Sequence, residues 1–161
     1  GARSFKYGTT KDYVINLEVV LADGRIINTG VDCAKNVTGY NLTQLFVGSE
    51  GTLGIITKAT LKLIPQPKSK KVLFAYFDTF EDTSNTVNNI ISSLITPSVI
   101  DILDKNTLLT IEKCNPVGLL TDKEAALLIE VDGDEEAINK QYEKIIEICK
   151  YFGANLRWVL K

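Results

Sequence analysis

Three glycines recur at every third position in residues 47–57, namely Gly48, Gly51 and Gly54. Glycine lacks Cβ, so its backbone can take a positive φ and another molecule can approach it closely. Exposed N–H groups in such a segment can bind phosphate oxygens or ring nitrogens. The segment lacks the Gly-Lys-Ser/Thr of a Walker A loop, and a predicted strand follows it rather than the helix of a Rossmann fingerprint. It is therefore either a ligand-binding turn or a plain turn between a helix and a long strand.

Two other polar segments could also line a ligand. Basic and hydroxyl side chains surround Gly8 in residues 3–10, which suits a polyanionic ligand or, equally, a solvated N-terminal arm. Residues 32–40 lie between a predicted strand and a predicted helix, where functional loops often occur. A plain connecting loop is the alternative for this second segment.

The acidic side chains do not follow a metal-binding pattern. Asp101, Asp104 and Glu112 stand apart, and residues 132–136 lack the alternating acids and closing glutamate of a calcium loop. Acidic residues at the start of a helix stabilise its N-terminal partial charge, which accounts for residues 132–136 without a ligand. We therefore predict no metal site.

Histidine and methionine are both absent from the sequence. The lack of histidine excludes Ser-His and Cys-His nucleophile pairs and His-ligated metals within these residues. The lack of methionine leads us to expect that the chain begins at Gly1 by processing or as part of something longer. Cys33, Cys114 and Cys149 match neither a disulfide framework nor a CxxC motif, so we expect reduced thiols in a cytoplasmic protein.

The composition is that of a globular protein. Of the 161 residues, 45% are apolar and 24% are charged, and 18 basic and 20 acidic side chains give a net charge of −2. This balance offers no electrostatic footprint for nucleic acid or an anionic membrane. No apolar run approaches the roughly 20 residues that cross a bilayer, so we expect no transmembrane segment. The length allows one ordinary domain or two small ones.

The N-terminal part of the chain is predicted to be mostly β. Residues 13–20 are rich in β-branched and aromatic side chains and predict a strand, and Asp23-Gly24 predicts a hairpin turn into a return strand. A short helix is predicted over residues 41–46, capped by its first residue. A long strand over residues 53–64 follows it.

The two prolines and the lysines of residues 65–71 predict a linker. Beyond it, strands and helices alternate. The predicted strands are 72–77, 98–103, 125–131 and 156–160, and the predicted helices are 79–95, 105–113 and 135–151. This order indicates a split β-α-β sheet with its helices on one face. The sequence therefore predicts an α+β protein of two modules.

Several segments together resemble the FAD-linked oxidases of the vanillyl-alcohol-oxidase type, whose cofactor lies in a PCMH-type FAD-binding domain. The resemblance rests on residues 3–10, 17–24, 35–57 and 61–65. It is to the branch that includes the glycolate oxidase D subunit and the D-lactate dehydrogenases. It is almost unbroken over residues 1–66, whereas residues 70–161 agree mainly in the order of their elements.

The resemblance implies an α+β fold in which residues 1–67 are the C-terminal part of a PCMH-type FAD-binding domain, within its second subdomain. Residues 68–161 would be the N-terminal, ferredoxin-like α+β segment of the FAD-oxidase C-terminal (cap) domain. The family's main pyrophosphate loop and the histidines of its cap match nothing in this sequence. We therefore expect a fragment that is inactive alone, with its catalytic residues elsewhere.

The resemblance also implies a set of residues that bind the FAD cofactor. These residues are Tyr7, Gly8, Glu50, Gly51, Thr52, Gly54 and Ile55. The turn at residues 51–55 would lie against the adenosine half of FAD, with backbone groups of Gly54 and Ile55 in contact with it. Glu50 would accept hydrogen bonds nearby, while Tyr7 and Gly8 would lie toward the flavin.

The implied function is that of an FAD-dependent oxidoreductase that transfers hydride from a small 2-hydroxy acid, of the glycolate or D-lactate type, to flavin. Its partners would be this substrate and the remainder of the same polypeptide, with no nucleic acid. Two alternatives stay open. One is a standalone small-ligand or protein-interaction module that keeps the fold of a flavin subdomain. The other is a phosphate-binding protein that uses residues 48–54 without flavin.

Overall fold

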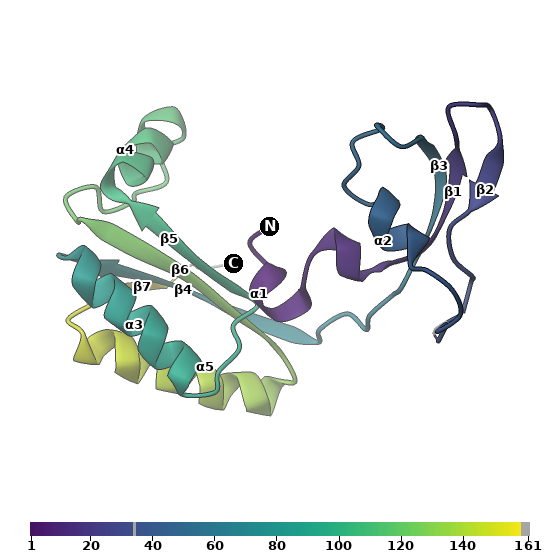
Figure 1. Ribbon diagram of the computed structural model, residues 1–161. Helices are drawn as coiled ribbons and strands as arrows, with labels where there is room; N and C mark the ends of the chain where they lie inside the picture. The colour runs from purple at the N-terminus through teal and green to yellow at the C-terminus, as the bar shows by residue number, and fades with distance from the viewer. Residues whose placement is uncertain (34, 159–161) are drawn as a thin grey trace. The chain divides into compact units, whose positions relative to one another are not determined.

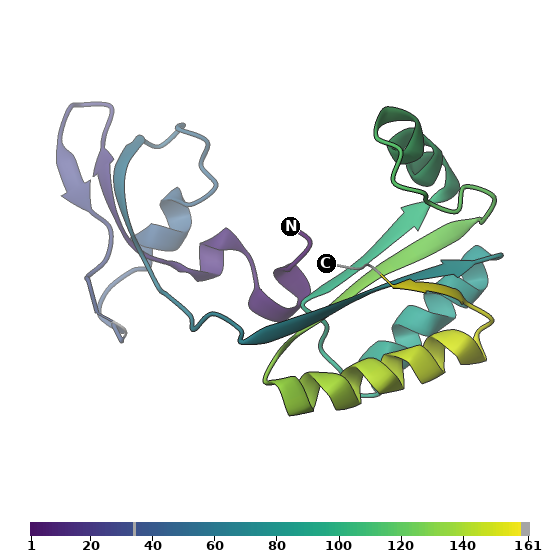
Figure 2. The same cartoon turned by 180° about the vertical axis from the view of Figure 1, so that it is seen from behind.

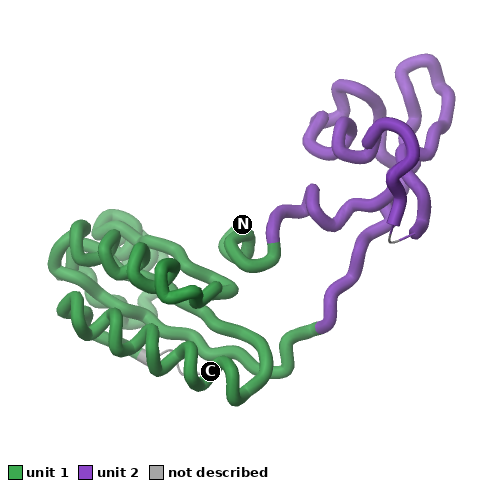
Figure 3. The backbone as a smooth tube through the Cα atoms, turned by 60° about the horizontal axis from the view of Figure 1, so that its bottom comes forward, with its two compact units in different colours: residues 1–7, 66–161 green, residues 8–65 purple. Residues whose placement is uncertain are grey.

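The computed structural model describes residues 1–33 and 35–158. The chain forms two compact units, unit 1 with Gly1–Tyr7 and Gln66–Lys161 and unit 2 with Gly8–Pro65 (Figure 3). The elements of unit 2 are η1 (Thr10–Asp12), β1 (Val14–Val20), β2 (Ile26–Asn28), α2 (Leu42–Phe46) and β3 (Ile55–Leu61). Those of unit 1 are α1 (Ser4–Tyr7), β4 (Ser69–Phe77), α3 (Phe80–Ser92), β5 (Val99–Asp104), α4 (Lys105–Cys114), β6 (Ala125–Gly133), α5 (Glu135–Tyr151) and β7 (Asn155–Trp158). Among the described residues, no helix is long and apolar enough to cross a membrane.

Unit 2 is a small antiparallel sheet with α2 packed against it. The strand order is β2-β1-β3, and the antiparallel pairing of β1 with β2 confirms the predicted hairpin. The predicted helix cap is also confirmed, because Asn41 Oδ1 accepts a hydrogen bond from the N–H of Gln44 at 3.1 Å. The buried core of this unit consists of Val14, Leu17, Val19 and Phe46.

Unit 1 is built on a four-stranded antiparallel sheet with the order β5-β6-β4-β7. Its central strands β4 and β6 pair without interruption from Ser69↔Gly133 to Phe77↔Ala125. Helix α3 connects β4 to β5 and α5 connects β6 to β7, which is the split β-α-β arrangement that the sequence predicts. Both helices cover the same face of the sheet (Figures 1 and 2). The larger core lies between these two helices and the sheet, and it includes Leu73, Phe77, Ile90, Leu127, Ile129 and Ile145.

Helix α4 lies on the opposite face of the sheet (Figure 1), so the prediction that the helices share one face is wrong for α4. Side chains alternate along a strand, so Leu73 and Phe77 of β4 face α3 and α5 while Tyr76 faces the other way. Leu108 of α4 packs there against Tyr76 and Ala126. The apolar spacing of a ten-residue helix shows that one side is buried, but not which face of the sheet receives it.

Some element ends differ from the predicted ones. Helix α3 ends at Ser92 rather than at residue 95, and Leu94 turns the backbone with a φ of 59°. Strand β4 begins at Ser69, three residues earlier than predicted, because its pairing with β6 continues as far as Gly133. The last predicted strand is found as β7, and its predicted residues 159–160 lie outside the described part of the chain.

Leu108→Ala tests whether the α4 face is a true part of the core. Leu108 is fully buried, and the loss of a buried leucine side chain costs about 2–5 kcal/mol. We expect the free energy of unfolding to fall by that amount in urea denaturation followed by circular dichroism. Leu109→Ala is the matched control, since Leu109 is 46% exposed and its loss should cost less than about 1 kcal/mol. Equal losses in the two variants would contradict the packing of α4.

Candidate functional site

The glycine-rich segment forms the turn between α2 and β3. Gly48, Glu50 and Gly51 have φ values of 88°, 52° and 79°, all in the left-handed region. The carbonyl of Ser49 closes the turn by accepting from the N–H of Thr52 at 3.0 Å and from its Oγ1 at 2.6 Å. A left-handed backbone at a non-glycine residue costs on the order of 1–3 kcal/mol. The turn therefore holds Glu50 in a conformation that it would not adopt by itself.

Gly54 is required by packing rather than by the turn. A Cβ atom at this residue would lie 2.7 Å from Val19 Cγ1 and 2.8 Å from the carbonyl oxygen of Val20. Both neighbours belong to β1, so the close approach to this glycine is made by the chain itself. Glycine is favoured at residue 48 for a different reason, namely its left-handed backbone with a φ of 88°. A Cβ atom there would meet nothing within 4 Å.

Ser49 is a polar residue of this turn that is not among the predicted cofactor residues. Its Oγ is buried and forms no hydrogen bond with any residue that the structure describes. The backbone N–H groups of Glu50 and Gly51 donate to no atom of residues 1–33 or 35–158. Buried polar groups normally have partners, so the Ser49 hydroxyl fits a ligand that accepts its hydrogen bond. The N–H groups of Glu50 and Gly51 belong to exposed residues and are accessible to the same ligand. The sequence feature that could have indicated Ser49 is its position between Gly48 and Gly51 in the glycine-rich segment.

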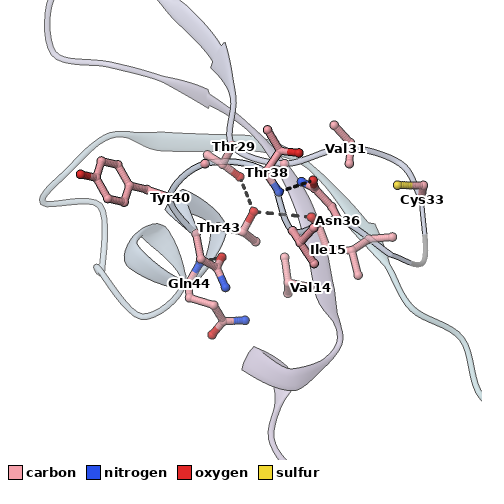
Figure 4. A pocket seen from close by; sticks show the side chains of 14 residues that line it. Val14, Ile15, Thr29, Val31, Cys33, Asn36, Thr38, Tyr40, Thr43 and Gln44 are labelled. Atoms are coloured by element: carbon pink, nitrogen blue, oxygen red, sulfur yellow. Dashed lines mark hydrogen bonds between the residues drawn. The ribbon is translucent and has the colours of Figure 1, made fainter.

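A pocket with a cavity volume of about 260 Å³ opens in unit 2 (Figure 4). Its wall comes from β1, from the segment that follows β2, from the predicted loop at residues 32–40, and from Asn41 and the start of α2. Thr29 Oγ1 and Thr43 Oγ1, both from buried residues, share a hydrogen bond of 2.8 Å in this wall. Its described lining residues are uncharged and do not include the turn at residues 48–55. The pocket therefore offers neutral hydrogen-bonding groups, with no charged side chain among its described lining residues.

The predicted cofactor residues fall into two groups. Five of them lie in one turn of unit 2, namely Glu50, Gly51, Thr52, Gly54 and Ile55. Gly8 belongs to the same unit but not to this turn. Ile55 begins β3 and is 62% exposed. Tyr7 belongs to unit 1, where charged side chains surround it.

Tyr7 lies in a cluster of ion pairs on β6. Its hydroxyl donates to Asp132 Oδ2 at 2.7 Å, while Lys6 Nζ pairs with Asp132 Oδ1 and donates to the Asp132 carbonyl at 2.6 Å. Arg3 Nη2 lies 2.6 Å from Glu130 Oε1. Asp132 and Glu130 are only 4% and 6% exposed. The N-terminal basic cluster is thus neither a solvated arm nor a free polyanion site, because its cations pair with buried carboxylates of their own unit.

These contacts shift the pKa values of Tyr7 and Asp132. Burial and the hydrogen bond to Asp132 raise the pKa of Tyr7 to about 12. Burial also raises the pKa of Asp132, but the hydrogen bonds from Lys6 and Tyr7 and the charges of Lys6 and Arg3 outweigh it, and this pKa lies below its ordinary value. At neutral pH the phenol therefore donates and the carboxylate is ionised.

The acidic run at residues 132–136 has two roles. Glu135 and Glu136 occupy the first turn of α5, where they stabilise its N-terminal partial charge. Asp132 belongs to β6 and holds α1, so the helix interpretation is wrong for this residue. Among the described residues, no group of three or more His, Cys, Asp or Glu side chains could hold a metal ion.

Comparison with known proteins gives relatives of the whole chain. The family model described as FAD linked oxidases, C-terminal domain, matches residues 66–159. The glycolate oxidase subunit GlcD of Bacillus subtilis is 53% identical over 150 residues, which are 93% of this chain and 32% of that protein. A D-lactate dehydrogenase of Archaeoglobus fulgidus is 41% identical over 155 residues, 96% of this chain and 34% of that protein. The chain thus spans about a third of the length of these relatives.

Solved structures of lower identity share the fold. An alkyldihydroxyacetonephosphate synthase matches with a TM-score of 0.77 at 22% identity, over 96% of this chain and 31% of that chain. A 4-ethylphenol oxidase from Gulosibacter chungangensis matches with a TM-score of 0.71 at 19% identity, over 94% and 34% of the two chains. The predicted α+β fold is confirmed by these matches together with the family model.

Asp132→Ala tests the ion pairs that hold α1. A hydrogen bond to a charged group contributes about 1.5–3 kcal/mol, and we expect a loss of that size in the free energy of unfolding at pH 7. In the unsubstituted chain this contribution is complete above the ordinary pKa of about 3.9 and is lost as the pH falls through the lower native pKa. The variant should therefore lose less stability than the unsubstituted chain between neutral pH and strong acid.

Asp134→Ala is the matched control for this experiment. The ion pair of Asp134 with Lys68 joins side chains that are 75% and 82% exposed, and such pairs contribute about 0–1 kcal/mol. Urea denaturation at several pH values measures both variants. A loss in Asp132→Ala no larger than that in Asp134→Ala would contradict the role assigned to the cluster.

Proposed function

The chain belongs to the family of FAD-linked oxidases, and from this membership we propose that it is part of an FAD-dependent oxidoreductase that oxidises a small 2-hydroxy acid. The observation that carries the proposal is the 53% identity with the glycolate oxidase subunit GlcD, because it extends over 93% of the chain and so includes both units. The D-lactate dehydrogenase relative supports the same class of substrate, since glycolate and D-lactate are both 2-hydroxy acids.

In this proposal unit 2 is part of the second FAD-binding subdomain, and residues 66–161 are the first part of the cap. The ion pairs of Arg3 and Lys6 with β6 support grouping residues 1–7 with the cap rather than with the flavin subdomain. The chain would supply one wall of the cofactor site. The groups that act on the substrate would lie in the part of a longer polypeptide beyond these 161 residues.

We propose that the turn at residues 51–55, together with Ser49 and Glu50 just before it, binds the adenosine half of FAD. Ser49 Oγ and the N–H groups of Glu50 and Gly51 are the donors that would hold it. Gly54 allows β3 to lie close to β1 and so fixes where the turn ends. Tyr7 and Gly8 stay predicted as flavin-side residues. FAD supplies the hydride acceptor when bound, while the protein supplies orientation and electrostatics.

For location we propose the cytoplasm. Cys33 and Cys114 are exposed and free, and Cys149 is buried, with a pKa that burial raises to about 12. Reduced thiols are the usual state in the cytoplasm. Two other relatives, the D-lactate dehydrogenases of Danio rerio and Arabidopsis thaliana, are named as mitochondrial enzymes, so cell fractionation is the experiment that distinguishes the two compartments.

The flavin content of two polypeptides tests the function. A longer polypeptide that includes the missing two thirds should purify with FAD, and glycolate or D-lactate should bleach its flavin absorbance in the absence of oxygen. The 161-residue chain alone should bind FAD weakly or not at all, because one wall of the site is absent. A longer polypeptide without flavin would contradict the proposed function. A stoichiometric yellow complex of the short chain would contradict the incomplete site.

Ser49→Ala in the longer polypeptide tests the proposed turn. Loss of one hydrogen bond costs about 0.5–1.5 kcal/mol, so the dissociation constant of FAD, measured by flavin fluorescence, should rise by roughly 2- to 10-fold. Ser92→Ala is the control, because Ser92 is exposed at the end of α3 in unit 1. An unchanged FAD affinity in Ser49→Ala would remove Ser49 from the site.

A further inference from the structure

Helix α1 is held against β6 by polar contacts rather than by apolar packing. It has only four residues, and none of residues 4–7 is buried. Its one fully apolar side chain, Phe5, is 47% exposed. A single helical turn is not stable by itself in water. The position of α1 therefore depends on the ion pairs and hydrogen bonds that Arg3, Lys6 and Tyr7 form with β6.

Asp132 is the centre of these contacts. Its Oδ1 pairs with Lys6 Nζ, while its Oδ2 accepts from the Tyr7 hydroxyl at 2.7 Å and lies 3.4 Å from Arg3 Nη1. The backbone of Asp132 belongs to the ladder between β6 and β4, opposite Lys70, and its side chain is buried. A buried side chain on a central strand has little freedom to move, so the groups that bind it take fixed positions.

The residues that follow α1 are held by contacts within unit 2. The N–H and Oγ1 of Thr9 donate to Asp12 Oδ2 at 2.6 Å and 2.9 Å. Gln44 Nε2 donates to the Lys11 carbonyl at 2.7 Å. Gly8 precedes these residues with a φ of 78°, and a Cβ atom there would lie 2.6 Å from Asp12 Oδ2. The backbone of Gly8 thus has a conformation that other residues rarely adopt.

The chain passes from unit 1 to unit 2 at the bond between Tyr7 and Gly8. These are the two residues predicted to lie toward the flavin. The hydroxyl of Tyr7 is bound by Asp132, which is 125 positions away in the sequence. A ligand of this segment therefore depends on Asp132, although Asp132 is not among the predicted cofactor residues.

The pair of Lys6 with Asp132 supplies direction more than net stability. Desolvation offsets much of the attraction between buried charges, so an apolar pair of the same shape is often as stable. The loss of one partner is nevertheless costly, because it leaves the other unpaired. Charge-assisted hydrogen bonds differ from apolar contacts in that they fix the geometry of both partners. The cluster thus has the properties expected of groups that hold Lys6 and Tyr7 in one place.

We propose that Asp132 is a positioning residue for the cofactor site. By holding Lys6 and Tyr7 on β6, it fixes the segment that leads into Gly8, and FAD binds to this segment in its fixed position. The inference rests on the proposed function, namely that the chain binds FAD with Tyr7 and Gly8 toward the flavin. Asp132 acts through Tyr7 and is not a catalytic residue. Because coupling between two sites is reciprocal, bound FAD in turn stabilises the ion pairs.

Asp132→Asn in the longer polypeptide tests the proposal. Asparagine has nearly the same shape, so the variant loses the charge but keeps an oxygen that accepts hydrogen bonds. The dissociation constant of FAD, measured by flavin fluorescence, should rise by roughly 10-fold or more. Asp134→Asn is the matched control, since it removes a negative charge from an exposed ion pair, and its dissociation constant should stay within about 2-fold. Equal dissociation constants in Asp132→Asn and the unsubstituted polypeptide would overturn the proposal.

Lys6→Gln removes the cation of the same pair. Lys6 is not among the predicted cofactor residues, so we expect its effect on FAD to pass through Asp132. Lys6→Gln alone should raise the dissociation constant of FAD by roughly 5-fold or more. An unchanged value would overturn the proposal, even where Asp132→Asn does not fold.

The double variant of Lys6→Gln with Asp132→Asn shows whether the two residues act as one unit. Residues that do so have non-additive effects, so the double variant should bind FAD no more weakly than Asp132→Asn alone. A fold-change in the double variant equal to the product of the two single fold-changes would contradict the inferred coupling.

The visible circular dichroism of bound flavin gives a readout that a general loss of stability does not change. Each variant is measured with saturating FAD, at a temperature well below its thermal midpoint, so that all of the protein is folded. Asp132→Asn should alter the intensity of the flavin bands, because the residues beside the flavin are displaced. Asp134→Asn should leave the bands unchanged. Identical bands in Asp132→Asn and the unsubstituted polypeptide would reduce Asp132 to a structural role and overturn the proposal.

The unsubstituted longer polypeptide separates this inference from the proposed function. If it purifies without FAD, the proposed function fails and this inference fails with it. If it is yellow and oxidises glycolate or D-lactate while Asp132→Asn binds FAD equally well, the proposed function stands and only the role of Asp132 is overturned.

Discussion

The ladder between β4 and β6 is the interaction on which unit 1 depends. It runs without a break from Ser69↔Gly133 to Phe77↔Ala125 and joins the two central strands of the sheet. Since side chains alternate along both strands, the ladder supplies one face to α3 and α5 and the other to α4. The end of the ladder near Ser69↔Gly133 carries the carboxylates that bind Arg3, Lys6 and Tyr7. A segment more than 120 positions earlier in the sequence is thereby part of the same unit.

Unit 2 has no comparable centre. Its sheet has three strands, its buried core is small, and β3 lies at an edge. The turn beside β3 presents a buried hydroxyl and two backbone N–H groups without partners in the described chain. Unpartnered polar groups at the turn and exposed apolar side chains in the same unit are both typical of surfaces that bind a ligand or another segment of protein. The chain spans about a third of the relatives that it matches and of two solved structures with its fold, and the longer polypeptide proposed above would cover both kinds of surface.

Local features were predictable because their causes lie within a few residues. The Asp23-Gly24 turn, the Asn41 cap and the helix at residues 135–151 all depend on neighbouring side chains, and the structure has each of them. The spacing of the glycines located a turn between α2 and β3, and the family resemblance is what proposed a cofactor for it. The glycines themselves have separate causes, a left-handed backbone at Gly51 and contact with β1 at Gly54. Spacing alone does not distinguish these causes.

The sequence by itself determined the element order, the two modules and the family, because periodicity, turn residues and motifs are local. The tertiary structure alone decided which face of the sheet received α4, where β4 begins, and that Asp132 binds Lys6 and Tyr7 rather than serving a helix. It also showed that Ser49 lacks a partner in the described chain. Each of these depends on groups that are far apart in sequence. Burial and charge pairing become defined only when folding brings such groups together.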